Sequence, residues 1–330
     1  INIDPDAIVS GRRNCEHCSL SEVFESQISF EHGLESMTFS NPAKALVING
    51  DIDSDDVITF LSLDDDFDAA IMVNGGGGND RVELNTDLTL GSASSTGNVS
   101  IVAETIKVTE SLDTTAGTIG AVTFTNGVLL DVNANGDLNL GGAFLQNGAG
   151  PVQLSGDITT TGHDITFEQA VLLTANVALS TGAGSGNIEF QDAIDDDGAV
   201  SNRQLTLDAG TGGVDFQGSV GETTPLRGVS IISAADVSVH ETLAAADQGI
   251  DFNTSGTVTI KSTVSTNDAD VQITAGNEGS GGTLSMSDGA QIDVGSARIH
   301  LTADGDITLG GLRTVNATDA AVVLTSFSGS

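Results

Sequence analysis

Five aspartates near the start of the repetitive part of the chain have the spacing of a calcium site. Asp51, Asp53, Asp55 and Asp56 precede one apolar stretch, and Asp80 precedes the next. Asp56 and Asp80 are 24 residues apart, so in a stack of coils with that period they should lie on neighbouring coils. Calcium takes about six to eight oxygen ligands, for which carboxylates are well suited. The spacing therefore predicts a Ca²⁺ site built from two coils.

A glycine-rich run supports this prediction but has a simpler alternative. The segment from Gly75 to Glu83 matches the nonapeptide pattern G-G-x-G-x-D-x-U-x of calcium-binding turns, and the carbonyl groups of 75–78 would add ligands. Calcium turns of this kind repeat about every nine residues, whereas the period of this chain is about 25. We therefore favour a plain corner turn and keep calcium as the functional alternative. The acidic runs 64–68 and 195–197 are interpreted as solvated loops, with cation binding as the alternative.

The two cysteines, Cys15 and Cys18, form the short motif C-E-H-C. Ser19 rather than His follows the motif, which excludes the c-type haem-attachment pattern. Three states remain: a local or intermolecular disulfide, which we favour, free thiols, and a zinc site that His17 and His32 would complete.

The charge of the chain limits its partners. There are 10 Lys and Arg against 46 Asp and Glu in 330 residues, a formal charge of −36. Such a surface repels nucleic acid and anionic membranes, and it suits either cation binding or solubility in a salty extracellular setting. No apolar run reaches the roughly 18 residues that span a bilayer, and no signal peptide opens the chain. Because it begins with Ile1 rather than Met, we interpret it as a processed or excised piece.

A recurring strand pattern indicates the elements that must position these groups. Apolar anchor strands begin at residues 58, 82, 106, 138, 165, 188, 214, 237, 258, 284 and 307. A second alternating strand precedes most of them, and glycine pairs with Asn or Asp mark the corners. The pattern predicts an all-β fold, a right-handed parallel β-helix of about eleven coils of roughly 25 residues.

Inward-facing residues of such a stack should form apolar columns, because parallel strands about 4.8 Å apart place equivalent residues above one another. The first predicted column is Phe60, Leu84, Val108, Leu140, Phe167, Phe190, Phe216, Val239, Ile260, Met286 and Leu309. The second is Leu88, Leu112, Phe144, Val171, Ile194, Val220, Leu243, Val264, Ile292 and Val315.

The two ends of the chain differ from the repeat. Residues 1–45 lie outside it, and we predict a cap or docking segment there with a short helical turn at 19–26, followed by the β-helix over 46–330. At the other end, Val322, Val323 and Leu324 belong to a coil that no amphipathic helix covers, although solenoids normally need caps. Either the chain continues in a longer parent, or the N-terminal segment of a second copy stacks on this coil, with Cys15 and Cys18 able to lock the contact.

Three stretches carry a family resemblance: "VINGDIDSDDVITF" at 47–60, "LTLDAGTGGVDFQGSVGETTPLRGVSIISAADVSV" at 205–239 and "IHLTADGDITLGG" at 299–311. They resemble the repetitive regions of large filamentous-haemagglutinin-like bacterial surface proteins, over roughly residues 46–324. The resemblance implies a right-handed parallel β-helix exported to the cell surface or beyond, acting in adhesion, surface coating or fibre building. The Cys-bearing N-terminal segment departs from that family.

These observations predict a structural extracellular protein, either a subunit of a surface fibre or sheath assembled head to tail or a rigid stalk of a large adhesin. The second class is an adhesive binding module that recognises a cell-surface ligand. A polysaccharide-degrading enzyme is the third, and we expect none. Sugar-cleaving sites use paired carboxylates with aromatic platforms, whereas the chain has no Trp or Tyr, and His163, His240 and His300 are isolated in the sequence. We expect no catalytic residue and no cofactor other than calcium.

Overall fold

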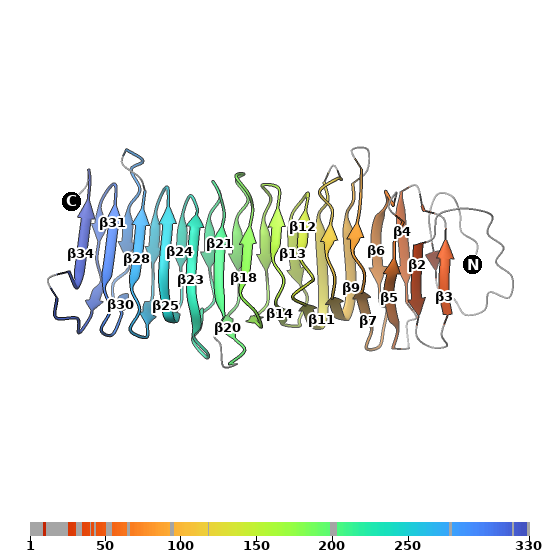
Figure 1. Cartoon of the computed structure of the whole chain (residues 1–330), viewed down its shortest axis with the longest axis horizontal. Coiled ribbons are helices and arrows are strands. Elements are labelled where there is room, and N and C mark those ends of the chain that lie inside the picture. Colours follow the sequence, from red (N-terminus) through yellow and green to blue (C-terminus); the bar gives the residue numbers. More distant parts are fainter. Residues whose placement is uncertain are drawn as a thin grey trace. The chain divides into compact units, whose positions relative to one another are not determined.

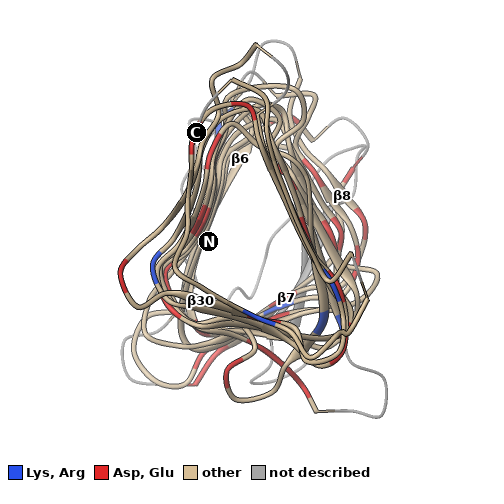
Figure 2. Cartoon of the chain, turned by 90° about the vertical axis from the view of Figure 1, so that its left-hand side faces the viewer, with Lys and Arg blue, Asp and Glu red and all other residues tan. Residues whose placement is uncertain are grey.

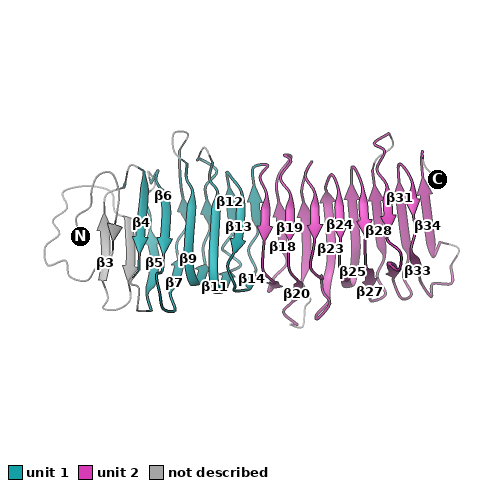
Figure 3. Ribbon diagram, turned by 180° about the vertical axis from the view of Figure 1, so that it is seen from behind, with its two compact units in different colours: residues 1–161 teal, residues 162–330 magenta. Residues whose placement is uncertain are grey.

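The structure, a computed structural model, describes residues 9–10, 26–30, 35–39, 41–42, 44–50, 55–64, 67–92, 96–117, 119–198, 203–276, 279–318 and 320–328. Cys15, Cys18, Asp51 and Asp53 lie outside these residues. So does the predicted helical turn at 19–26 except for Ser26, which is in a strand. The described residues form strands and turns without any helix. They divide into two compact units, residues 1–161 and residues 162–330 (Figure 3).

The predicted parallel β-helix is confirmed, with about 12 turns of about 23 residues. Alternation explains why these sequences form strands, since every second side chain points inward, as in β9 (Val99–Val108) and β21 (Gln204–Asp208). Each coil has three sides, which we call A, B and C in chain order. The coils closest to the viewer in Figure 2 show this three-sided outline, with acidic residues along the sides and at the corners.

Unit 1 contains the first coils, and successive coils lie side by side (Figure 1). Side A is built from β4 (Ala45–Asn49), β6 (Ala70–Asn74), the first parts of β9 and β11 (Val122–Val132), and β13 (Phe144–Asn147). Side B contains β5 (Val57–Ser62), β7 (Arg81–Leu84), the second parts of β9 and β11, and β14 (Val152–Leu154). Side C contains β8 (Leu88–Thr89), β10 (Leu112–Asp113), β12 (Leu138–Leu140) and β15 (Ile158–Thr160).

Three further strands belong to the N-terminal part of unit 1. β1 (Val9–Ser10) pairs with β4 in parallel. β2 (Ser26–Phe30) pairs in antiparallel fashion with β3 (Glu35–Phe39) and with β5. The antiparallel pairings distinguish this part from the repeat.

Unit 2 repeats the three-sided coil. Side A contains β16 (Ile165–Phe167), β19 (Ile188–Phe190), β22 (Val214–Phe216), β24 (Val237–Val239), β26 (Val258–Ile260), β29 (Leu284–Met286) and β32 (Ile307–Thr308). Side B contains β17 (Val171–Leu173), β20 (Ile194–Asp196), the first part of β25 (Leu243–Thr254), β27 (Thr263–Thr266), β30 (Gln291–Asp293) and β33 (Gly311–Arg313). Side C contains β18 (Val177–Ser180), β21, most of β23 (Leu226–Ser233), the second part of β25, β28 (Val271–Ala275), β31 (Ile299–Ala303) and β34 (Val322–Ser326).

The core of each unit is a set of stacked apolar columns. In unit 2, Phe167, Phe190 and Phe216 lie above one another with ring centroids 5.3 and 5.7 Å apart and nearly parallel planes. In unit 1, Phe124 and Phe144 meet edge to face at 6.0 Å. All five rings are buried, and such contacts add to the stabilisation from apolar burial.

The predicted columns are correct in parts but change side within the chain. Phe60, Leu84 and Val108 do stack on side B of unit 1. Leu140, however, lies on side C, and the column that begins with Phe167 runs along side A of unit 2. The second predicted column likewise passes from side C at Leu112 to side A at Phe144.

The predicted columns change side because one coil was missed in the sequence. The segment 129–132 of β11 pairs with 105–108 of β9 and is therefore the next side B strand, but it was not among the predicted anchors. This is why about 12 coils are present rather than eleven. The last predicted core positions are also wrong, since Val315 is 71% exposed and Leu309 is 39% exposed.

Candidate functional site

The predicted calcium residues converge at the corner between sides A and B in the first coils of unit 1. We call this the Asp80 corner, consisting of Asp56, Asp80 and Glu104 with Gly50 and Gly75. The predicted stacking of Asp56 and Asp80 is confirmed, because the backbone N–H of Asp56 donates to Oδ1 of Asp80 at 2.9 Å. One coil further, Oε2 of Glu104 accepts the backbone N–H of Asp80 at 2.8 Å. Three carboxyl groups thus lie on three successive coils.

The middle carboxyl group, that of Asp80, is in an unfavourable place for a negative charge. The residue is only 1% exposed, and Oδ2 has no hydrogen-bond donor among the residues that the structure describes. Burial raises the pKa of Asp80 above its ordinary value of 3.8, opposed by the Asp56 N–H, while the charges of Glu104 and Asp56 raise it further. The neighbouring Arg81 does not compensate, since its Nε pairs with Glu83 at 3.0 Å.

Two glycines make room for these carboxyl groups. A Cβ atom on Gly75 would lie 2.6 Å from Oδ2 of Asp80. A Cβ atom on Gly50 would lie 1.8 Å from the carbonyl oxygen of Gly75 and 2.7 Å from Oδ2 of Asp56. The glycine-rich nonapeptide therefore serves as a corner turn in which the backbone approaches a buried carboxyl group closely.

The other predicted ligands contribute less to this corner. Oδ1 of Asp55 accepts the backbone N–H of Asn79 at 2.8 Å in an exposed position. Asp51 and Asp53 are not among the described residues. Within the described ranges, no group of three or more His, Cys, Asp or Glu side chains is placed so that it could hold a metal ion. Calcium binding therefore stays a prediction.

The next two coils fill the same corner with amides. Asn126 pairs in register with Ala103, the residue before Glu104, and Gln146 lies on the following coil. Nε2 of Gln146 donates to Oδ1 of Asn126 at 2.7 Å, and Nδ2 of Asn126 donates to the carbonyl oxygen of Gly150 at 2.7 Å. Both side chains are fully buried. Because amides carry donors as well as acceptors, this pair satisfies itself without charge.

The remaining corners show a regular contact that the sequence analysis missed. An Asp or Asn directly before a strand accepts, through Oδ1, the backbone N–H of the equivalent residue in the next coil. Eight such bonds of 2.6–3.2 Å are seen in the described residues: Asp87 with Ser111, Asn98 with Ala121, Asp137 with Asp157, Asp164 with Asn187, Asn176 with Gln204, Asn187 with Gly213, Asp236 with Thr257, and Asp270 with Arg298. We call them the corner ladder.

The corner ladder explains part of the acidic composition. Each bond satisfies a backbone donor at the position where the strand ladder has not yet begun. The signal in the sequence is an Asp or Asn immediately before an inward-facing Leu, Ile or Val, as at Asp137 and Asn187. Many aspartates are therefore structural acceptors rather than ligands.

The run of aspartates at 195–197 is likewise engaged and is not simply a solvated loop. Oδ1 of Asp195 accepts the backbone N–H groups of Thr223 and Thr224 at 3.0 Å. Asp196 is buried and accepts the N–H of Gly198, and Asp197 pairs with Arg203 at 3.1 Å. In the run 64–68, Asp64 and Asp68 are bonded to Asn41 and Ser92, and residues 65–66 are not described.

A further buried acid, Asp304 in unit 2, was also missed. It is 2% exposed, and its Oδ2 accepts the backbone N–H of Gly281 on the preceding coil. The N–H groups of Gly281 and Gly279 lower the pKa of Asp304 below its ordinary value, more strongly than burial raises it. Oγ of Ser328 donates to its carbonyl oxygen at 2.7 Å. The glycine-rich segment about one coil earlier is the signal in the sequence.

The prediction that the histidines are isolated is wrong for His240. Its Nε2 lies 3.0 Å from Oδ1 of Asp215, and Nζ of Lys261 lies 3.2 Å from its Nδ1. Stacking brings together residues that are one coil apart. His163 is exposed. Asp215, His240 and Lys261 form a partly exposed polar stripe across three coils.

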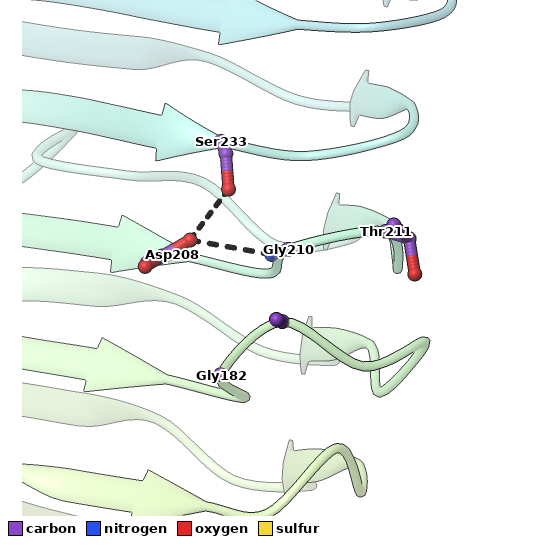
Figure 4. A pocket seen from close by; sticks show the side chains of 6 residues that line it. Gly182, Asp208, Gly210, Thr211 and Ser233 are labelled. Atoms are coloured by element: carbon purple, nitrogen blue, oxygen red, sulfur yellow. Dashed lines mark hydrogen bonds between the residues drawn. The ribbon is translucent and has the colours of Figure 1, made fainter.

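A shallow depression lies on unit 2 where side C ends. It has a volume of about 370 Å³ and is lined by Gly182, Ala183, Asp208, Gly210, Thr211 and Ser233 (Figure 4). Oδ1 of Asp208 accepts hydrogen bonds from the Ser233 hydroxyl group and from the backbone N–H of Gly210 at 3.3 Å. The polar groups are thus already paired, and the lining carries no aromatic residue.

The predicted assembly residues lie on β34. Val322, Val323 and Leu324 are 38%, 37% and 46% exposed. The proposed covalent lock cannot be placed beside them, because both cysteines lie outside the described residues. The part of the chain that the structure describes has no helix long and apolar enough to cross a membrane.

Comparisons with family models, with curated proteins and with solved structures found no match to this chain. The class that the fold defines is a parallel β-helix repeat protein.

Proposed function

We propose that this chain is a structural extracellular protein. It is a subunit of a surface fibre or sheath that assembles head to tail, or a rigid stalk segment of a large adhesin of the filamentous-haemagglutinin-like type. Its partner is a second copy of the chain or the remainder of a longer parent. This proposal rests on the β-helix, on the residues that carry the family resemblance and on the exposed edge of β34.

The edge of β34 is the observation that carries the proposal. Residues 322–326 pair in parallel with residues 299–303 of β31, and no other described strand pairs with β34. The free edge of a strand offers N–H and C=O groups to another strand. Val322 and Leu324 are in register with the buried Ile299 and Leu301, so their side chains continue the core column. A second copy stacked there would bury them, and repetition of such a heterologous contact builds a filament.

The interior supports a mechanical role. Within each unit, backbone hydrogen bonds connect every coil to its neighbours, and the corner ladder adds side-chain bonds outside the strands. Each coil contacts mainly its neighbours, as in other solenoids, so stiffness comes from repetition rather than from one central core. The net charge of −36 opposes lateral clumping.

Electron microscopy of the purified chain tests the proposal. We expect fibres of uniform width from the intact chain, and their loss in a variant lacking residues 1–45. Leu324→Lys should also block assembly, because it places a charge in the core column of the contact. Val323→Lys is the matched control, since Val323 is in register with His300 on the outer face.

If every preparation contains only single particles, self-assembly is refuted, and the hypothesis that remains is a stalk segment of a longer chain. Fibres that persist in both the deletion variant and Leu324→Lys would refute the head-to-tail contact. An adhesive binding module remains the second candidate, with the depression at Asp208 as its surface. That the protein is not an enzyme stays a prediction.

A further inference from the structure

The Asp80 corner differs from the corner ladder in the use of its oxygen atoms. Oδ1 of Asp80 and Oε2 of Glu104 each accept one backbone N–H from the preceding coil. The other oxygen of Asp80 is buried and has no donor among the described residues. A buried acceptor without a partner is rare in folded proteins and needs a physical reason.

Oxygen atoms lie close to the two glycines of the Asp80 corner. Oδ2 of Asp80 lies where a side chain on Gly75 would be, and Oδ2 of Asp56 lies with the Gly75 carbonyl oxygen where a side chain on Gly50 would be. The two glycines thus bring carboxylate and carbonyl oxygens of adjacent coils together. Calcium prefers this set of ligands and tolerates irregular geometry, whereas Mg²⁺ demands a near-octahedral site.

The amide pair on the following coils shows what the acidic corner lacks. At the same corner, Gln146 donates to Asn126, and Asn126 in turn donates to the carbonyl oxygen of Gly150, because each amide carries both a donor and an acceptor. Ionised carboxylates only accept, so three of them in a column need a proton or a cation. One proton would neutralise one of three negative groups, whereas a divalent ion compensates two.

We propose that Asp56, Asp80 and Glu104 bind one Ca²⁺ ion beside Gly50 and Gly75 and so connect the first three complete coils of unit 1. The three carboxyl groups are distributed one per coil and do not yet surround a single point. Binding therefore draws the side chains of Asp56 and Glu104 towards Oδ2 of Asp80, and the Gly75 carbonyl group and water complete the ligands. Glu104, 24 residues after Asp80, is the ligand that the nonapeptide pattern does not contain.

The test is a calcium titration of the full chain by calorimetry, with thermal unfolding in Ca²⁺ and in chelator at constant ionic strength. We expect one saturable site per chain, lost in Asp80→Asn and weakened at least tenfold in Glu104→Gln. Saturating Ca²⁺ should raise the Tm of the wild type by roughly 5 °C, with no rise in Asp80→Asn. Asp137→Asn is the matched control, because Asp137 is a corner acid of unit 1 that accepts one N–H. It should bind calcium like the wild type.

Two outcomes would overturn the proposal. The first is the absence of a saturable site in the wild type, or an equal response of Asp80→Asn and Asp137→Asn, which would indicate only diffuse attraction to the acidic surface. The second is a wild-type Tm that rises from pH 7 to pH 5 in chelator and does not change with Ca²⁺ at either pH. That result would mean that a bound proton, and not Ca²⁺, compensates the charge of the Asp80 corner. If Asp80→Asn does not fold, the stoichiometry of the wild type and the loss in Glu104→Gln still decide the question.

Discussion

Asp80 and Asp304 are both buried aspartates that accept a backbone N–H from the preceding coil, yet their environments are opposite. Asp80 lies between two further carboxyl groups and has an unpartnered oxygen atom, and its pKa is raised. Asp304 receives several backbone N–H groups from the segment 279–281, and its pKa is lowered. Ionised Asp304 thus stabilises the folded state of unit 2, whereas ionised Asp80 destabilises the folded state of unit 1. The number of donors decides the difference.

The largest effect is expected for Asp304→Ala. This change removes the acceptor of the N–H groups of Gly279 and Gly281, which leaves these donors without their partner in the protein and loosens the turn that they form. We expect the Tm of the protein to fall by several degrees at pH 7, as followed by circular dichroism. Asp288→Ala is the control, because Asp288 is exposed in a turn of the same unit. Equal melting of the two variants would contradict the role of Asp304.

The next effect is expected for Asp80→Asn in chelator. The amide oxygen still accepts the Asp56 N–H, and the new NH₂ group can donate to Glu104, so the corner comes to resemble the amide pair. We expect stabilisation of about 0.5–1.5 kcal/mol at pH 7, measured by urea unfolding. Asp304→Asn should instead destabilise the protein, because the new NH₂ group is a donor and would face the backbone N–H groups of residues 279–281, which are also donors. Destabilisation by both variants would remove the contrast between the two acids.

The pH dependence should separate the two acids further. A raised folded-state pKa means that the native state binds more protons, so the cost of ionised Asp80 begins above its ordinary pKa of 3.8 and is complete above the folded-state pKa. The advantage of Asp80→Asn over the wild type should therefore grow with pH in that window. The contribution of Asp304 is fully present above its ordinary pKa of 3.8 and is lost as the pH falls through its lowered folded-state pKa. Unfolding curves of both variants should be measured between pH 2.5 and 8, on the order of one curve per half pH unit. They would show whether the contribution of Asp80 changes above the ordinary pKa of aspartate and that of Asp304 below it.

The smallest effect is expected at the corner ladder. Asp137→Asn keeps an oxygen for the N–H of Asp157, so the free energy of unfolding should change by less than about 0.5 kcal/mol. Asp137→Ala removes the acceptor and should cost about 0.5–1.5 kcal/mol. Urea unfolding of this pair measures the hydrogen bond apart from the charge. A large loss in Asp137→Asn would mean that the charge itself stabilises the corner.

The fold was predictable because alternation and period are local properties of the sequence. The assignment of strands to sides was not, since all three sides carry the same alternation of apolar and polar residues. The omission of 129–132 shows the limit: Asn126 and Gly127 resemble a turn that ends a strand, but β11 continues through them with a shift of register.

The candidate site was predictable in its spacing and not in its chemistry. The 24-residue interval placed Asp56 above Asp80 correctly. Nothing in the sequence indicated that Asp80 points inward while Asp55 stays at the surface, because burial at a corner depends on where the backbone bends. Glu104 follows the same interval but is part of an uninterrupted strand, and so the glycine motif did not include it.

The corner ladder has an evolutionary consequence. The same bond forms between residues that are 20 apart, as at Asp137, and 28 apart, as at Asp270, because loops away from the corner absorb the difference. Duplication or deletion of one coil, or lengthening of one loop, therefore preserves the contact as long as an Asp or Asn remains before the strand. A gene of this kind can change in length by recombination between its own repeats and still encode a folded product.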